Sequence, residues 1–200
     1  MSTAPPYLMT PGPVRQEDRD RLTVDLTSWA RARPALRPHT EALITLLHHS
    51  DGAEIITLSG DGQLLAVLHL VREPLLTAWN IPTCTEPGLL LCHLVKSPHA
   101  PAGEDIMRLV TLWSADFAAR TGKQWVRGEV PLPTGTPADT NRLLALAQDI
   151  GWGHEKTVST PVGHVALMQC RAEPHPNQNL FLDCQVPTIP VPVGPTVVRP

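Results

Sequence analysis

The chain has 200 residues, of which 42% are hydrophobic, a size and composition suited to one domain with a buried core. Its net charge of -3 and its 16 scattered Lys and Arg residues argue against a nucleic-acid partner. No apolar run approaches the roughly 18 to 20 residues that span a bilayer, and the N-terminus lacks the apolar core of a signal peptide, so we expect a cytoplasmic protein with no membrane contact.

Two amphipathic helices are predicted at the start of the core. In residues 15–33, Leu22, Leu26 and Trp29 recur at helical spacing behind a charged first turn. A shorter apolar segment at residues 40–50 predicts a second helix.

A hairpin and a central strand follow. The runs at residues 53–59 and 63–71 are apolar and partly β-branched, and the Gly-Asp-Gly sequence between them predicts a tight antiparallel turn. The segment at residues 89–96 is apolar enough for a strand that is buried on both faces.

The second half of the core alternates helices and strands. Apolar residues at helical spacing across residues 103–121 predict the clearest helix, which Gly122 ends. A strand at residues 123–130, a helix at 138–150 and a last strand at 162–170 complete the pattern. This order predicts an α/β sheet with helices on both faces.

Both ends differ from the middle in their proline content. Proline lacks the backbone donor that helices and sheets need, so we expect residues 1–13 to form an N-terminal arm and residues 172–200 an extended or disordered Pro-rich tail. The predicted domain is then residues 14–171. The tail is a candidate ligand for a protein partner, although a solvated tail is more common.

The order and the residues together resemble the GCN5-related N-acetyltransferase (GNAT) superfamily over about residues 8–170. GDGQLLAVLHLV is similar to its second and third strands, and GLLLCHLVK to the fourth, whose splayed end accepts the pantetheine arm of acetyl-CoA. PAGEDIMRLVTLWSADFAARTGKQWVRGEV is similar to the pyrophosphate loop, its helix and the fifth strand, and NRLLALAQDIGW to the helix that ends in Gly-Phe. The resemblance implies a mixed, mostly antiparallel central sheet with helices on both faces.

The resemblance also implies acetyl-CoA as acyl-donor cosubstrate. In such a site, a turn of small residues lets backbone N–H groups converge on the diphosphate at the N-terminus of a helix. The residues that match the family's cofactor site are Leu94, Val95 and Lys96 for the pantetheine, Ala102, Gly103, Glu104, Asp105, Ile106 and Met107 for the diphosphate, and Asn141 for the CoA arm.

The loop departs from the family's Q/R-x-x-G-x-G/A pattern. Gly103 matches one glycine, but Ala100 stands at the Gln/Arg position and Asp105 at the second glycine position. An acid in the first turn stabilises a helix by about 0.3 to 1 kcal/mol. A carboxylate about 5 Å from a bound diphosphate charge would repel it by roughly 1 to 3 kcal/mol. We therefore expect Asp105 to weaken anion binding if it faces the ligand.

The catalytic pattern is also incomplete. Family members often use a tyrosine near the end of the Gly-Phe helix as the acid for the leaving thiolate, and Ala147 or Gln148 holds that place here. The chain has one tyrosine, Tyr7, in the N-terminal arm. For a base that deprotonates the amine, the candidates are Glu129 and His93, on the strands that flank the acyl cleft in the family.

Each candidate has a structural alternative. His93 is more often a hydrogen-bonded histidine near the core, and Glu129 could pair at the surface with Arg127 or Lys156. Asn141 could serve only at the N-cap of its helix, as could Asp139 or Thr140.

The remaining cysteines and histidines suggest no further chemistry. Cys84, Cys92, Cys170 and Cys184 form no C-x-x-C pair, and the histidines show no metal-ligand spacing, so inert thiols and no metal site are expected. The abundance of Ala, Pro, Leu and Arg over Lys is typical of a GC-rich bacterial genome.

Two hypotheses follow. The first is an acetyl-CoA-dependent N-acetyltransferase with a degenerate pyrophosphate loop, acting on an unidentified small-molecule or peptide amine. The alternative is a GNAT-fold module without turnover that binds a partner or regulates, and a homodimer through the N-terminal arm is compatible with either.

Overall fold

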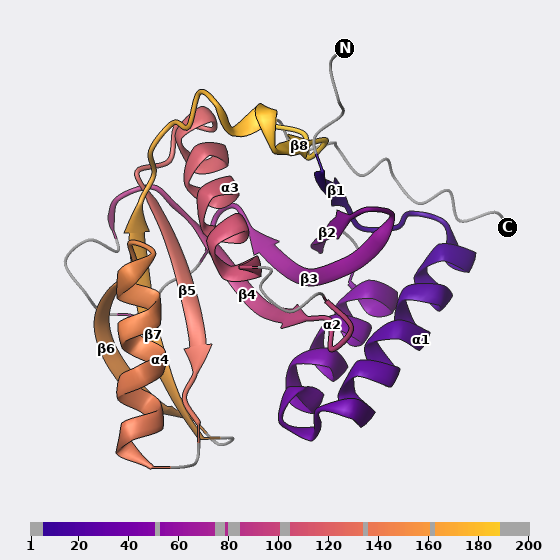
Figure 1. The fold of residues 1–200 in the computed structure, drawn as a ribbon, viewed down its shortest axis with the longest axis horizontal. Coiled ribbons are helices and arrows are strands. Elements are labelled where there is room, and N and C mark those ends of the chain that lie inside the picture. Colours follow the sequence, from indigo (N-terminus) through magenta and orange to yellow (C-terminus); the bar gives the residue numbers. More distant parts are fainter. Residues whose placement is uncertain are drawn as a thin grey trace, which may run out of the picture.

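One eight-stranded mixed sheet organises the chain in the computed structural model, which describes residues 6–50, 53–74, 79, 85–100, 105–133, 136–160 and 163–188 (Figure 1). The strand order is β6-β7-β5-β4-β3-β2-β1-β8. Neighbouring strands are antiparallel except for the pairs β4/β5 and β1/β8. The strands are β1 (Tyr7–Pro11), β2 (Glu54–Gly60), β3 (Gln63–Val71), β4 (Gly88–Lys96), β5 (Trp125–Pro131), β6 (Gly153–Thr160), β7 (Gly163–Arg171) and β8 (Leu182–Cys184).

Helices cover both faces of this sheet, as the sequence predicted. The α-helices are α1 (Gln16–Ala32), α2 (Arg37–His49), α3 (Ile106–Arg120) and α4 (Pro137–Asp149), and short 3₁₀ turns lie at Pro34–Leu36 and Gln178–Leu180. In Figure 1, α1 and α2 lie together, apart from α3 and α4. The fold is therefore α/β with a mixed, mostly antiparallel sheet.

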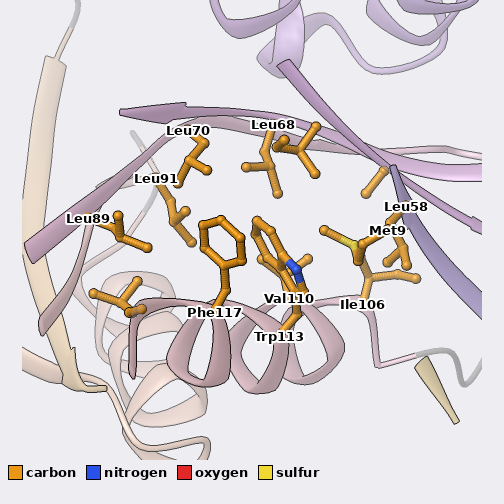
Figure 2. Close-up of a cluster of buried hydrophobic side chains, with 14 of the residues drawn as sticks. Met9, Leu58, Leu68, Leu70, Leu89, Leu91, Ile106, Val110, Trp113 and Phe117 are labelled. Carbon is orange, nitrogen blue, oxygen red and sulfur yellow. The ribbon is translucent and has the colours of Figure 1, made fainter. Parts of the chain in front are cut away.

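The face under α3 holds the largest core. Figure 2 shows Trp113 and Phe117 pointing from α3 toward leucines of β3 and β4, among them Leu68 and Leu91. Both aromatic side chains are fully buried, and their rings stack with centroids 5.4 Å apart. The helical spacing of apolar residues in the sequence thus becomes the stripe that attaches α3 to the sheet.

The opposite face holds a second cluster. Leu26 and Trp29 of α1 and Leu43 of α2 pack there against Val67 of β3 and Val95 of β4. Since side chains alternate along a strand, β3 sends Val67 to this cluster while Leu68 faces α3.

The predicted hairpin is confirmed by its turn. Asp61 and Gly62 both have positive φ, 49° and 74°, as a type I′ turn between β2 and β3 requires. Gly122, with φ 72°, follows α3 in the left-handed conformation that the sequence predicted.

Three strands were not predicted. β1 pairs with β2, and β8 pairs in parallel with β1, so parts of both terminal segments belong to the sheet rather than lying beyond the domain. Met9, Leu182 and Val186 are buried in the α3 core, because apolar residues between the prolines still pack. β6 is an edge strand with mostly exposed side chains, so it lacks an apolar signal. Residues 189–200 of the Pro-rich tail lie outside the described residues.

The described helices are all too short or too polar to cross a bilayer.

Candidate functional site

β4 and β5 pair only over the first part of their length. The parallel ladder begins at Gly88 opposite Trp125 and ends at Leu91 opposite Gly128. Beyond that point, β4 continues to Lys96 paired only with β3, and β5 continues to Pro131 paired only with β7. The two facing strand edges therefore present backbone N–H and C=O groups to an opening in the middle of the sheet.

A bulge in β4 lies beside this opening. His69 of β3 faces Cys92, but Val67 faces Val95, so β4 has one more residue than β3 in this interval. His93 lies within the bulge and adopts a positive φ of 53°. A positive φ is uncommon for a residue other than glycine. The backbone of the bulge therefore determines the direction in which the His93 side chain points.

The bulge also changes which face each β4 residue meets. Leu89 and Leu91 pack under α3, and in a regular strand the next odd residues would do the same. Instead, Val95 packs among the residues of α1 and α2, and Leu94 packs against the α3 core. His93 is thereby turned toward α2.

A cavity of about 200 Å³ occupies the opening. Its walls come from the end of α1, from α2, from the diverging parts of β4 and β5, and from the first turn of α3. The polar or charged side chains in its lining are Arg33, His39, His93, Lys96 and Glu129, and the others are Leu36, Leu94, Ile106, Met107, Val130 and Pro131. A smaller, mostly apolar cavity of about 50 Å³ shares Leu94 and Met107 with it and is also lined by Val110, Ala147 and Trp152.

Three imidazoles meet at the wall formed by β3, β4 and α2. Nδ1 of His39 lies 3.4 Å from Nδ1 of His93, and the His69 ring stacks on His93 with centroids 6.4 Å apart and planes 8° apart. Burial lowers the pKa of each, and the neighbouring imidazoles lower the pKa of His39 and His93 further. The three rings are therefore neutral near pH 7. The described residues include no cluster arranged to hold a metal ion.

Glu129 lies on the other wall. Its Oε1 accepts a hydrogen bond of 3.3 Å from the indole Nε1 of Trp79, which is buried. Arg127, one of the two expected surface partners, is instead fully buried and donates to the carbonyl of Glu86. Glu129 is exposed, so the cavity side of its carboxylate is accessible.

Cys92 precedes His93 but is not a nucleophile. Burial, and secondly the charge of Glu129, raise the pKa of its thiol to about 12. Cys170 is also shifted to about 12, mainly by burial. Both thiols stay protonated at neutral pH, in agreement with the inert thiols expected at these two positions.

The N-terminus of α3 is capped by its own acid. Asp105 is the N-cap residue, and its Oδ1 accepts a 3.0 Å hydrogen bond from the backbone N–H of Arg108. The Arg108 guanidinium lies 3.5 Å from the same carboxylate, and both side chains are mostly exposed, so this ion pair adds little stability. Ala102, Gly103 and Glu104 lie outside the described residues.

The positions expected for a tyrosine hold Ala147 and Gln148, neither of which can donate a proton as an acid. Ala147 lines the smaller cavity, and its carbonyl accepts the backbone N–H of Trp152 at the end of α4. The Trp152 indole donates a 2.7 Å hydrogen bond to Thr111 and is buried against Gly128. Tyr7 lies in β1, three strands away from β4.

The predicted site residues divide into three groups. His93, Leu94, Lys96, Ile106, Met107 and Glu129 line the larger cavity. Asp105 directly precedes Ile106, the first α3 residue that lines the cavity. The side chain of Val95 is buried in the cluster of α1 and α2, so only the backbone of Val95 can contact a ligand in the cavity. Asn141 is exposed on α4 and lines neither cavity, and the N-cap of α4 is Thr136, in a capping box with Asp139.

His39 and Trp79 were missed by the sequence analysis. His39 lies on a different element from His93, 54 residues earlier, and no spacing rule connects the two. Trp79 lies 50 residues before Glu129, and no spacing rule connects these two residues either.

Comparison with known proteins supports the fold at low sequence identity. No protein-family model and no curated protein matches the chain. Solved structures do: an uncharacterized protein from Bacillus halodurans has a TM-score of 0.59 at 16% identity and covers 86% of each chain. A GNAT-family acetyltransferase from Listeria monocytogenes has a TM-score of 0.54 at 11% identity, over 82% of this chain and 94% of that one.

The spermidine N-acetyltransferase from Vibrio cholerae, solved in complex with CoA and spermine, matches with a TM-score of 0.53 at 9% identity over 82% of this chain and 95% of that one. These likenesses, together with the β4–β5 opening, show that the chain has the GNAT fold.

Proposed function

We propose that this protein is an acetyl-CoA-dependent N-acetyltransferase that acts on a small-molecule or peptide amine. The observation that carries the proposal is the opening between β4 and β5, where His93 and Glu129 line one cavity from opposite strands. A cavity of about 200 Å³ suits a small amine or a single side chain rather than a large ligand.

The edges of the opening fit a pantetheine arm. Beyond Leu91, β4 pairs with β3 only, and beyond Gly128, β5 pairs with β7 only, so the strand edges that face the opening can hydrogen-bond the amide groups of an extended chain. Leu94 and Met107 add apolar surface beside them. Bound acetyl-CoA would supply an activated acyl group to the acceptor amine.

The chain's own contribution is placement and a base. An amine arrives as an ammonium ion, which must lose a proton before its nitrogen can form the new C–N bond. His93 is neutral at pH 7, since burial lowers its pKa, so its imidazole can accept that proton. Glu129 is the second candidate, held by the indole of Trp79.

The first experiment is thermal unfolding with and without millimolar acetyl-CoA. A ligand at about 100 times its dissociation constant adds roughly 2.7 kcal/mol, which raises the midpoint of a domain of this size by about 5 to 10 °C. Desulfo-CoA serves as a matched control for binding without chemistry, and thiol release in the presence of a panel of amines tests turnover. Absence of both the shift and the thiol would contradict the proposal.

Two observations favour the alternative, a GNAT-fold module without turnover. Asp105 occupies the N-cap of α3 with a carboxylate where a diphosphate would need free donors, and Ala147 supplies no acid. A shift with desulfo-CoA but no thiol release with any amine would support this alternative. A partner that binds through the Pro-rich tail stays a prediction, because residues 189–200 lie outside the described part.

A further inference from the structure

Two imidazoles from different elements share one hydrogen bond at the wall of the cavity. His39 extends from the first turns of α2 and His93 from the β4 bulge, and their Nδ1 atoms lie 3.4 Å apart. Both line the cavity that also contains Glu129. The contact exists because the bulge turns His93 toward α2.

A hydrogen bond between two Nδ1 atoms constrains both tautomers. One ring must carry its proton on Nδ1 and donate it, and the other must have an unprotonated Nδ1 that accepts it. One of the two neutral rings is therefore protonated on Nδ1 and keeps a lone pair on Nε2. The other holds its proton on Nε2.

We propose that His93 is the ring that donates, so that His39 fixes the Nε2 atom of His93 as the basic nitrogen of the site. This proposal rests on the proposed function, and within it His39 is a positioning residue. His39 acts only through its hydrogen bond to His93, and Nε2 of His93 is the atom that accepts the proton.

The proton balance is simple. Nε2 of His93 accepts one proton from the acceptor's ammonium group, which leaves a neutral amine and an imidazolium on His93. The Nδ1–H bond to His39 then becomes charge-assisted and stronger, so His39 stabilises the product of the proton transfer. A second proton would place two N–H groups against each other, so the pair takes up one proton and not two.

The surrounding charges are compatible with this exchange. Glu129 on β5 favours a cation on His93, whereas Lys96 on β4 and Arg33 at the end of α1 oppose it. His69 on β3 stacks on His93, and Glu54 on β2, which lies near His69, is paired with Arg72. Because two cations oppose the imidazolium on His93, this charged state is short-lived. His93 can then release its proton to solvent, as a general base must.

The test begins with the protein free of any ligand. Long-range ¹H–¹⁵N correlation spectra of histidine-labelled protein near pH 7.5 report the tautomer of each ring, and His93→Gln identifies the His93 signals by their loss. We expect the Nδ1–H tautomer for His93 and the Nε2–H tautomer for His39. The reverse assignment would overturn the proposal.

Three variants separate positioning from structure. His39→Phe removes the acceptor and should return His93 to the Nε2–H tautomer, whereas His39→Asn offers an amide oxygen near the place of Nδ1 and should retain the wild-type tautomer. His49→Phe, at an exposed position of the same helix, is the matched control. If His93 kept its Nδ1–H tautomer in His39→Phe, His39 would not be the residue that fixes it.

If thiol release with an amine is observed, His39→Phe should lower kcat about 10- to 100-fold with little change in KM, and His39→Asn should restore most of it. Equal loss of kcat in both variants would overturn the role of His39. If the tautomers are as expected but neither binding nor thiol release occurs, the pair stands as a structural finding and the proposed function fails.

Discussion

Asp105 stabilises helix α3 in the folded chain but would oppose the binding of a diphosphate at the same helix end. As N-cap it satisfies the backbone N–H of Arg108, which stabilises α3 by about 1 kcal/mol. The same carboxylate places a negative charge where the helix would otherwise attract an anion. Helix stability and diphosphate binding therefore compete for one residue.

This competition gives a prediction for acetyl-CoA affinity. Asp105→Asn keeps a capping side chain but removes the charge, so we expect the dissociation constant to fall about three- to tenfold at low salt. Isothermal titration calorimetry with acetyl-CoA measures it. Asp25→Asn makes the same charge change at an exposed position of α1 and should leave the affinity unchanged.

Asp105→Gly separates charge from donor occupancy. Glycine also frees the N–H of Arg108 for the ligand, at a cost of only a few tenths of a kcal/mol in helix stability. A gain confined to the glycine variant would assign the effect to that donor. No gain in either variant would contradict our interpretation of the loop.

Also at the residue scale, the three imidazoles predict how stability depends on pH. Burial lowers the pKa of His39, His69 and His93 below 6.5, so the unfolded chain binds more protons in the window beneath that value. Stability is then complete above about pH 7 and falls as the pH decreases through 6.5 toward the folded-state values.

Urea midpoints at pH 7.5 and 5.5 measure this fall. His69→Gln removes one of the three groups, so its midpoint should decrease less between the two pH values than that of the wild type. His49→Gln replaces an exposed histidine and should show the full decrease. If the decrease in His69→Gln matched the wild type, burial of His69 would not contribute.

Among the elements, β8 shows that the segment after β7 supports the sheet. Leu182 is almost fully buried in the α3 core, and Arg72 of the region after β3 donates to the carbonyls of Pro187 and Thr188. The Trp113 indole also contacts the Cys184 sulfur at 3.2 Å. β8 therefore forms the edge strand of the sheet, and these contacts hold it against β1 and α3.

We expect Leu182→Ala to lower the free energy of unfolding by about 2 to 4 kcal/mol, through lost burial and a cavity beside Met9. Leu180→Ala changes the same side chain two residues earlier, at a position that is 73% exposed, and should cost less than about 0.5 kcal/mol. Chemical denaturation of both variants measures the difference. Equal costs would mean that β8 is not part of the core.

The elements that the sequence predicted are those whose apolar pattern is strong. The hairpin of β2 and β3, the central strand β4 and the helix α3 follow directly from periodicity and from Asp61-Gly62. β6 could not be predicted, since its side chains are mostly exposed, and β8 has only three residues. Because of the prolines near β1 and β8, the sequence predicted an arm and an extended tail there, although a proline removes only its own backbone donor.

The site was predicted less completely than the fold. The sequence offered His93 and Glu129 as candidates, and the structure places them on one cavity, while their roles stay predictions. The partners of these residues, His39 and Trp79, could not be found from spacing. The His39 contact depends on a one-residue bulge, and a bulge of this kind leaves no pattern in the apolar residues of β4.

At the scale of the whole molecule, the net charge of -3 does not describe the cavity. Its lining holds two cationic side chains, Arg33 and Lys96, and one carboxylate, Glu129, with two imidazoles that are neutral at pH 7. A polyamine would bring several positive charges to this lining, whereas an amine that also carries a carboxylate or phosphate would pair with the cations.

We therefore expect that, among amines of similar size, those with an anionic group are acetylated with a kcat/KM at least about tenfold above that of spermidine. Thiol release from acetyl-CoA with matched pairs, an amino acid and its decarboxylated amine, measures the preference. Arg33→Gln should reduce it several-fold, because Arg33 is an exposed residue of the cavity lining and its loss removes one of the two cations there. Arg31→Gln, a similar change at an exposed residue of α1 that does not line this cavity, should preserve the preference. Preference for spermidine in the wild type would show that Glu129 outweighs both cations at the point where the acceptor binds.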